Sequence, residues 1–482
     1  MKIKKVFLFY PPGSQYQRGE DRSQGNVENS TATSMRAPND MAYVSSQLEK
    51  IKIQNSFTDY SSEKKTLEDL IFDFKKFSPD AVITSTTTST IKDDLRIINE
   101  MKAHKKDCIF IMKGSIFFKA PIFLLDSLDL KNIDFLIGGE IEFAAVNIIN
   151  KINKNHGNFL EVPGIYVREN GIWKDSKFDN WSKEIDDLPL PNRKIINNSL
   201  YFRPDTGEPQ ATIATSRGCP SACVYCLTPT ISGKKTRFRS PKSIIEELED
   251  CYFNHGIKNF FFKSDTFTIN HSWVKDVCDH ILKSKLKDKI QWVANSRVRP
   301  LQDDTPKIMR EAGCWLIAFG FETGSEETIK KIKKGATIDE NLRAAKIVKH
   351  AGIKIYGFFL VGLPWEKQEH LDATEKHIFE INSDFIELHI AVPYYGTELY
   401  DIAKKEGLLK VPVIGQNYFE EALTGTKFLT PQQLTEWRKK ILFKYHSRPS
   451  YIFSRFKESF TDRRKFLNYA KHAIKLYKNI YK

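Results

Sequence analysis

Three cysteines lie within one stretch of eight residues, as Cys219, Cys223 and Cys226, with the spacing C-x3-C-x2-C. Thiolates are soft ligands, and they select zinc or an iron–sulfur cluster. A structural zinc site needs four ligands, and no other cysteine or histidine lies within 20 residues of Cys226. Three ligands on a four-iron cluster leave one iron open, as a catalytic site requires. The spacing therefore predicts a [4Fe–4S] cluster held by these three residues.

The loop around the cysteines has the residue types of a tight turn, with Gly218 before Cys219 and Pro220 after it. The other cysteines are widely spaced, and we expect them to be small buried apolar residues. They are Cys108, Cys251, Cys278 and Cys314. Seven cysteines in 482 residues do not make a disulfide scaffold, so we expect a reducing, cytoplasmic location.

The elements that must position the cysteines form a βα series from Ala211 to about Tyr394. The strand candidates are Ala211–Thr215, Asn259–Lys263, Gln291–Asn295, Leu316–Phe319, Ile355–Val361 and Phe385–Val392. Helical patterns begin near Pro241, Ser272, Thr305, Glu326, Asp339 and Lys367. Strands that alternate with helices indicate a parallel sheet. The count predicts a six-stranded partial (β/α) barrel with the cysteines directly after its first strand.

The cysteine motif and the barrel pattern resemble the radical S-adenosylmethionine (radical SAM) superfamily. This resemblance implies that S-adenosylmethionine binds the open iron and contacts residues at the strand ends. By the resemblance, these residues are Tyr225, Ser264, Asp265, Arg297, Glu322, Thr323, Ser325, Gly362 and Pro364. The family commonly has glycine before the glutamate of the fifth-strand segment, whereas this chain has Trp365 before Glu366. The segment Lys334–Thr337 is similar to a helix-capping segment of the family.

The first 150 residues repeat the βα alternation, with strand candidates Lys5–Tyr10, Ile51–Asn55, Ala81–Thr84, Cys108–Met112 and Phe135–Ile137. Ligands of open parallel sheets bind outside the carboxyl ends of the strands. Small residues at these ends let a backbone approach a large ligand, although turn chemistry alone also explains any one of them. The strand-end residues are Pro12, Gly13, Ser85, Thr86, Thr87, Gly114, Gly138, Gly139 and Glu140.

This layout resembles the cobalamin-binding radical SAM proteins, the group around anaerobic magnesium-protoporphyrin ester cyclase and the hopanoid methylases. The resemblance rests on the N-terminal domain with its Tyr-Pro-Pro opening, on the Gly-Gly-Glu at residues 138–140 and on a Leu-Pro-x-Pro linker at residues 188–191. It implies a cobalamin cofactor at the strand ends. Many cobalamin domains supply an axial histidine from a loop after the first strand, but the first histidine here is His104. Bound cobalt would therefore lack that ligand.

The sequence thus predicts an α/β protein with four parts. They are a Rossmann-like domain of the cobalamin-binding type at 1–150, a linker with a hairpin at 151–205, a radical SAM partial barrel at 206–400 and a helical, basic region at 401–482. The hairpin is expected at Ile165–Trp173, with Asn170-Gly171 at its turn.

The C-terminal region carries much of the positive charge. Residues 431–482 hold 14 Lys/Arg against 3 Asp/Glu, a balance of 14 − 3 = +11, while the whole chain has +14. This distribution argues against a nucleic-acid-binding surface over the whole protein. Between 462 and 482 an apolar stripe recurs at helical spacing, at Phe466, Tyr469, Ala470, Ala473 and Tyr477. The helix either docks on the barrel or lies on an anionic membrane surface as a peripheral contact.

The resemblance implies the chemistry. A reduced cluster cleaves S-adenosylmethionine, the resulting radical takes hydrogen from an unactivated carbon, and methylcobalamin delivers a methyl group. We expect a small-molecule or lipid-like substrate and an electron donor such as flavodoxin or ferredoxin, and we assign no catalytic residue beyond the cluster ligands. Two alternatives remain open: radical cyclisation, rearrangement or C–C coupling without methyl transfer, and a non-catalytic redox sensor.

Overall fold

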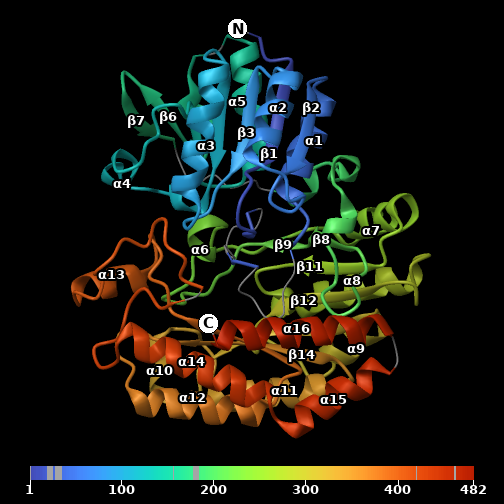
Figure 1. The fold of residues 1–482 in the computed structure, drawn as a ribbon. Coiled ribbons are helices and arrows are strands. Elements are labelled where there is room, and N and C mark those ends of the chain that lie inside the picture. The colour runs from blue at the N-terminus through green and yellow to red at the C-terminus, as the bar shows by residue number, and fades with distance from the viewer. Residues whose placement is uncertain are drawn as a thin grey trace.

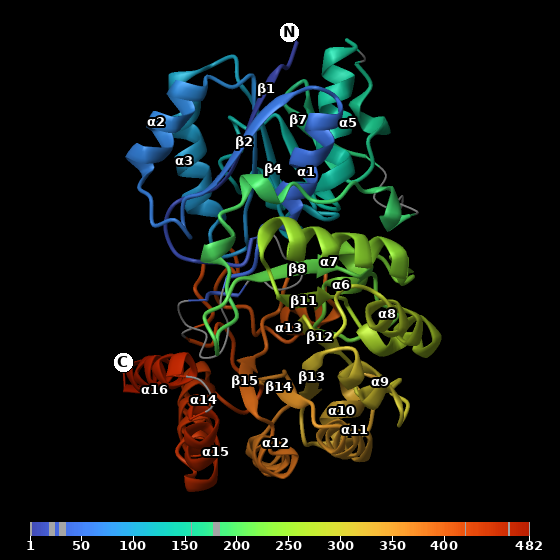
Figure 2. The same cartoon turned by 90° about the vertical axis from the view of Figure 1, so that its right-hand side faces the viewer.

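The computed structural model describes residues 2–18, 25–27, 35–155, 157–176, 184–419, 421–460 and 463–481. Two sheets lie one above the other, the N-terminal sheet in blue and cyan and the second sheet in green to orange (Figure 1). The last helices, in red, pack along one side of the second sheet (Figure 2). The predicted α/β fold class is confirmed.

The first sheet has the order β2-β1-β3-β4-β5-β6-β7. Its five parallel strands are β1 (Lys5–Tyr10), β2 (Gln54–Asp59), β3 (Ala81–Ser85), β4 (Ile109–Lys113) and β5 (Phe135–Ile137). The apolar runs in β1, β3, β4 and β5 are buried on both faces, whereas the edge strand β2 is polar and only partly buried. Helices α1 (Asn39–Lys50) and α5 (Ile141–Asn153) cover one face, and α2 (Leu67–Phe77) and α3 (Ile91–His104) cover the other. A short helix, α4 (Ile122–Asp126), follows β4.

Two sequence expectations about this sheet need correction. The strand expected at Ile51–Asn55 lies at Gln54–Asp59, because pairing with β1 begins only at Lys5 opposite Gln54. The hairpin expected in the linker is present as β6 (Ile165–Glu169) and β7 (Ile172–Asp175). It is part of the sheet, since β6 pairs antiparallel with β5.

The second sheet is parallel and follows the order of the chain. Its strands are β8 (Gln210–Ala214), β11 (Asn259–Lys263), β12 (Gln291–Ser296), β13 (Cys314–Glu322), β14 (Lys354–Val361) and β15 (Phe385–Ile390). Its outer face is covered by α7 (Pro241–His255), α8 (His271–Lys283), α9 (Thr305–Glu311), α11 (Ile338–His350) and α12 (Gln368–Ile381). The strands and intervening helices confirm the predicted partial barrel, with β8 and β15 as its open edges.

Short elements complete the two halves. They are β9 (Ser216–Arg217), α6 (Thr228–Ile231), β10 (Arg237–Phe238), α10 (Glu326–Lys331) and single 3-10 turns at Ser115–Phe117, Phe159–Glu161, Ile185–Asp187, Arg193–Ile195, Asn198–Leu200 and Phe267–Ile269. The chain after the barrel forms α13 (Glu398–Lys405), α14 (Pro431–His446), α15 (Pro449–Ser459) and α16 (Arg463–Tyr481). Apolar residues of α14 belong to the barrel core, which fixes this region on the sheet. Within the described residues, the chain forms no helix that is both long and apolar enough to span a bilayer.

Candidate functional site

The cysteine loop follows the first barrel strand and is held by backbone contacts on both sides. Gly218 has a φ of +92°, and a Cβ there would overlap the carbonyl oxygen of Lys235, so only glycine fits this position. The amide of Gly218 donates to the Asp265 carboxylate over 2.7 Å. The amide of Cys219 donates to the carbonyl of Gly233 over 3.0 Å. These contacts give the loop one shape before any ligand binds.

Hydrogen-bond donors approach the sulfur atoms. The backbone N–H of Thr228 lies 3.4 Å from the Cys226 sulfur, and Nη1 of Arg297 lies 3.5 Å from the Cys223 sulfur. Burial alone would lower the pKa of Arg297, but the charge of Cys223, its hydrogen bond to Arg297 and the charges of Cys219 and Tyr225 together outweigh burial and raise it. Donors of this kind stabilise thiolates and tune an iron–sulfur cluster.

The three cysteines line one cavity of about 370 Å³ at the carboxyl ends of the barrel strands. Four of the nine residues predicted to contact S-adenosylmethionine line the same cavity, namely Tyr225, Asp265, Arg297 and Glu322. A cavity of this size is in the ordinary range for small-molecule sites. The structure thus places thiols, a guanidinium and carboxylates around one space.

A buried ion pair forms one wall of this cavity. Nζ of Lys334 lies 2.6 Å from Oε1 of Glu322, and both side chains are nearly inaccessible to solvent. Glu322 has a φ of +66°, at an irregularity in the pairing of β13 with β14. Its carboxylate lies so close to Gly320 that a Cβ on that residue would overlap it. Burial raises the pKa of Tyr225 well above its ordinary value, and the nearby Glu322 charge raises it further.

Five of the predicted contacts with S-adenosylmethionine do not line the cavity. Ser264 is hydrogen-bonded to Ser216 over 2.6 Å. Thr323 is hydrogen-bonded to Thr374, and Ser325 is the N-cap of α10. Gly362 and Pro364 belong to the turn after β14.

The turn after β14 is closed by Glu366, the residue that follows the unusual Trp365. Its Oε2 accepts hydrogen bonds from the amides of Gly362 and Leu363, at 2.7 and 3.1 Å. The side chain is fully buried. Burial raises the pKa of Glu366 to about 7, although the two amides act in the opposite direction. Trp365 packs with Val224, Tyr225 and Leu363 in one apolar cluster, which supports the cysteine loop from behind.

Sequence reasoning missed several residues that line the cavity. Lys334 was assigned to a helix-capping segment, yet its ammonium group reaches the centre of the site. Others include Arg36, Asn295, Glu387, His389 and Arg438. Asn295, Glu387 and His389 alternate along their strands on the inward side, so the period-2 pattern of the strands was the available signal. Arg36 and Arg438 come from distant segments and carry no local signal.

The donor set fits an iron–sulfur cluster. Among the described residues, no three His, Cys, Asp or Glu side chains converge closely enough to hold a single metal ion. The thiols of Cys219, Cys223 and Cys226 instead surround a shared space, with an N–H donor beside two of the sulfurs. Three thiolates of this kind are the ligands of a [4Fe–4S] cluster with one open iron.

A separate polar cavity of about 900 Å³ lies at the carboxyl ends of β1 and β3. It is lined by Pro12 and Gly13 after β1 and by Ser89 and Thr90 after β3. In the strand order β2-β1-β3, the chain switches direction between β1 and β3, and ligands of such sheets bind at this switch point. None of the described residues that line this cavity is a histidine. Asn26 lines both this cavity and the cysteine cavity, so the two adjoin.

The remaining strand-end residues of the first sheet are engaged within the protein. The hydroxyl of Thr86 donates to Asp94, which also pairs with Arg18 at 2.6 Å. Ser85 donates to Asp40 over 3.1 Å. Thr87 is hydrogen-bonded to Thr90, the residue directly before α3. The expectation that a ligand binds at these strand ends stays a prediction.

The glycines and Glu140 at the other strand ends have structural roles as well. A Cβ at Gly138 would lie 2.6 Å from the carbonyl oxygen of Phe117, and one at Gly114 would lie 2.8 Å from Thr86. Gly139 lies beside Gly164. Close packing therefore explains glycine at 114 and 138. Glu140 pairs with Arg237 at 2.5 Å and joins the first sheet to the barrel.

Glu140 belongs to a cluster of buried ion pairs. Its carboxylate also lies 3.3 Å from Arg217, and Arg217 pairs with Glu142. All four side chains, Glu140, Glu142, Arg217 and Arg237, are at most 11% exposed. Arg217 is two residues before Cys219 in the chain. The ion pairs thus connect the first sheet directly to the strand that carries the cysteine loop.

Comparisons with known proteins agree with this geometry. Residues 213–378 match the family described as the Radical SAM superfamily. A protein of Pyrococcus horikoshii named an uncharacterized methyltransferase is 28% identical over 455 residues, 94% of each chain. The anaerobic magnesium-protoporphyrin IX monomethyl ester cyclase of Cereibacter sphaeroides is 24% identical over 409 residues, which cover 81% of this chain and 64% of that protein.

Among solved structures, the cobalamin-dependent S-adenosylmethionine radical enzyme OxsB, with aqua-cobalamin and S-adenosylmethionine bound, superimposes with a TM-score of 0.71. The match covers 99% of this chain and 72% of that one, at 16% identity. At this identity the likeness establishes the shared fold, including the N-terminal sheet as well as the barrel.

Proposed function

We propose, from the premise that the chain carries a radical SAM domain, that it methylates an unactivated carbon of a small molecule with the help of cobalamin. The domain implies a [4Fe–4S] cluster and S-adenosylmethionine. The observation that carries the proposal is the cavity in which three thiols, Arg297 and the Glu322–Lys334 pair surround one space. When bound, the cluster and S-adenosylmethionine supply a carbon-centred radical, and cobalamin supplies the methyl group.

The chain's own residues bind, orient and exclude water. Cys219, Cys223 and Cys226 hold the cluster, and the N–H of Thr228 stabilises one thiolate. The planar guanidinium of Arg297 suits the carboxylate of S-adenosylmethionine. A buried carboxylate such as Glu322 suits a ribose hydroxyl, and the ammonium group of Lys334 holds that carboxylate in place over 2.6 Å. The reaction needs no general base, and none is assigned.

The cobalamin part rests on three supports. One relative is named a methyltransferase, and a protein of the same fold is cobalamin-dependent. The cavity at the switch point of the first sheet adjoins the cysteine cavity, so a ligand there would reach the barrel. Its described lining holds no histidine, so the cobalt would not have an axial histidine from this wall.

The experiment is anaerobic reconstitution with iron and sulfide, followed by incubation with S-adenosylmethionine and a reductant. We expect about four irons per chain and release of 5′-deoxyadenosine. The triple variant with Ala at 219, 223 and 226 should have neither. Stoichiometric zinc with no iron in an active protein would refute the assignment. Iron without release of 5′-deoxyadenosine would favour a redox sensor instead.

Retention of cobalamin is tested separately. The purified chain should retain hydroxocobalamin, and the absorption and electron paramagnetic resonance spectra of the bound form should lack the signature of a histidine ligand. Failure to bind cobalamin at micromolar concentration would remove methyl transfer and leave cyclisation, which the name of the cyclase relative favours.

Two further proposals concern partners. One is reduction by flavodoxin or ferredoxin, and the other is a peripheral membrane contact of the basic tail. Flotation with anionic liposomes tests the membrane contact.

A further inference from the structure

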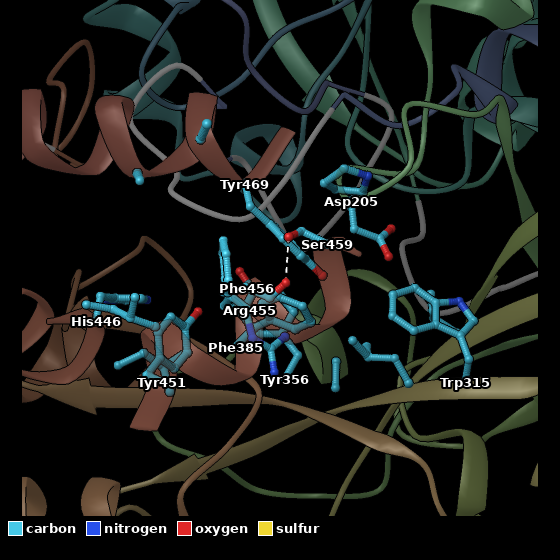
Figure 3. Close-up of a pocket in the computed structure, with 18 of the residues that line it drawn as sticks. Asp205, Trp315, Tyr356, Phe385, His446, Tyr451, Arg455, Phe456, Ser459 and Tyr469 are labelled. Carbon is cyan, nitrogen blue, oxygen red and sulfur yellow. Dashed lines mark hydrogen bonds between the residues drawn. The ribbon is translucent and has the colours of Figure 1, made fainter. Parts of the chain in front are cut away.

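A further cavity of about 630 Å³, called the second cavity because it is the second one in the barrel, lies between the inner face of the barrel sheet and the helices α15 and α16 (Figure 3). Aromatic and aliphatic side chains form most of its wall. From the strands they include Val293, Leu316, Tyr356 and Phe385, and from α15 they include Tyr451 and Phe456. This cavity has none of the cysteines and has not been assigned a role above.

The second cavity is continuous with the cysteine cavity. Four residues line both of them, namely Arg36, Asn295, Ala318 and Phe358. Along β13 the inward-facing residues are Leu316 in the second cavity, Ala318 at the junction and Gly320 in the cysteine cavity. Four residues of a strand span about 13 Å. A ligand with a reacting carbon near the cysteines could therefore extend along the strands for about this distance.

The C-terminal helix supplies the outer wall. Phe466, Tyr469, Ala470, Ala473 and Tyr477, the apolar stripe predicted from the sequence, all line the second cavity. This placement agrees with the docked alternative for the helix. Asn468 holds the helix near the barrel through a 3.1 Å bond to the carbonyl of Asp205, and Tyr469 donates to Glu458 over 2.9 Å.

Three charged side chains line the second cavity, Arg36, Asp205 and Arg455. Arg36 lies at the junction with the cysteine cavity, 4.1 Å from the ring centroid of Phe261. Asp205 pairs with Arg203 at 2.6 Å.

Arg455 is paired with Glu458 at 2.9 Å and Asp384 at 3.3 Å. Its guanidinium also lies 5.0 Å from the ring of Phe385. Burial lowers the pKa of His446 to about 4, so this imidazole is neutral near pH 7. An uncharged, apolar ligand suits such a wall better than an anion or a cation.

We propose that the second cavity binds the uncharged apolar chain of the substrate, whose reacting carbon lies in the cysteine cavity. This inference rests on the proposed function and specifies its substrate class as a lipid-like molecule with a chain of about 13 Å or more. Half-exposed apolar residues of the two helices, Ile452, Phe456, Phe466 and Tyr477, border the cavity. They provide an apolar path by which such a chain enters.

The test uses diphenylhexatriene, an uncharged apolar rod whose fluorescence rises in an apolar site, with the full-length purified chain. We expect saturable binding of one probe per chain. Ala473→Trp places an indole in the cavity and should weaken binding at least tenfold, and Ala470→Trp should do the same. Lys471→Trp, on the same helix but outside the cavity lining, is the matched control and should bind as the parent does.

Equal binding by the parent, Ala473→Trp and Lys471→Trp, or no saturable binding by the parent, would overturn the inference. Circular dichroism and iron content of each variant show that the fold and the cysteine site persist. Release of 5′-deoxyadenosine is measured on the same samples. If 5′-deoxyadenosine is released but the probe does not bind, the substrate inference fails alone. If the probe binds in the expected pattern but no 5′-deoxyadenosine is released, the proposed function fails and the apolar site stands.

Discussion

Replacement of Glu366 by glutamine should change how the stability of the barrel depends on pH. Burial raises the pKa of this carboxyl from 4.5 to about 7 in the folded protein. The folded state therefore holds the proton more tightly than the unfolded state does. The stabilisation from this group is complete below pH 4.5 and is lost as the pH rises to about 7.

The magnitude follows from the two values. A difference of one pKa unit corresponds to 1.36 kcal/mol, so the rise from 4.5 to about 7 corresponds to about 3 kcal/mol. Glutamine keeps an oxygen for the amides of Gly362 and Leu363 and carries no charge. Glu366→Gln should therefore exceed the parent by about 1 kcal/mol near pH 5 and by about 3 kcal/mol at pH 8. For a cooperative unit of roughly 200 residues, this is a rise in Tm of several degrees.

The assay is thermal unfolding followed by circular dichroism at pH 5, 6, 7 and 8 for the parent and the variant. The control is Glu369→Gln, three residues further on, where the side chain is 71% exposed. It should leave the pH profile of Tm unchanged. A Tm difference between Glu366→Gln and the parent that stays constant from pH 5 to pH 8 would refute the reasoning, because the carboxyl would then titrate alike in both states.

Two further substitutions test the cysteine cavity. Gly218→Ala should displace the cysteine loop, because a Cβ overlaps a backbone oxygen there, and should lower the iron content after reconstitution several-fold. Gly256→Ala has a similar positive φ but open space around the Cβ, so it should cost about 1 kcal/mol of stability and leave the iron content unchanged. Lys334→Met leaves the Glu322 carboxylate without its cation and should weaken binding of S-adenosylmethionine about tenfold in a calorimetric titration. Lys333→Met changes an exposed neighbour and should leave the affinity for S-adenosylmethionine unchanged. Equal affinities of the two variants would contradict the role of the ion pair.

The residues that sequence could place are those whose position follows from local order. Cys219, Cys223 and Cys226 share one short loop, so their spacing alone indicated a common site. Arg297 and Glu322 come at the ends of parallel strands, which must meet at one edge of the sheet. The apolar stripe of α16 was also predictable, because its residues recur at the helical period.

The sequence does not predict which surface each helix faces or which side chains form hydrogen bonds and ion pairs with each other. The periodicity of α16 does not say whether the stripe faces a barrel or a membrane. Ser325 and Thr323 belong to one motif, but the partners of their hydroxyls are set by the folded structure. Ser325 accepts from the backbone of α10, and Thr323 is hydrogen-bonded to Thr374 of α12. Lys334 contacts Glu322, which lies 12 residues earlier in the chain, and no sequence pattern predicts this contact.

The buried ion pairs between the two sheets limit how the molecule can move. If the first sheet rotated away from the barrel, Glu140 and Glu142 would leave Arg217 and Arg237. Separation of buried partners leaves uncompensated charge, which costs about 3–5 kcal/mol for a pair. A swing of the first sheet would therefore pull on β9, and with it on the loop that begins at Gly218. The ion pairs therefore hold the start of α5 against the loop that carries the cysteines, and we expect a gate for a large ligand to open at another place in the chain.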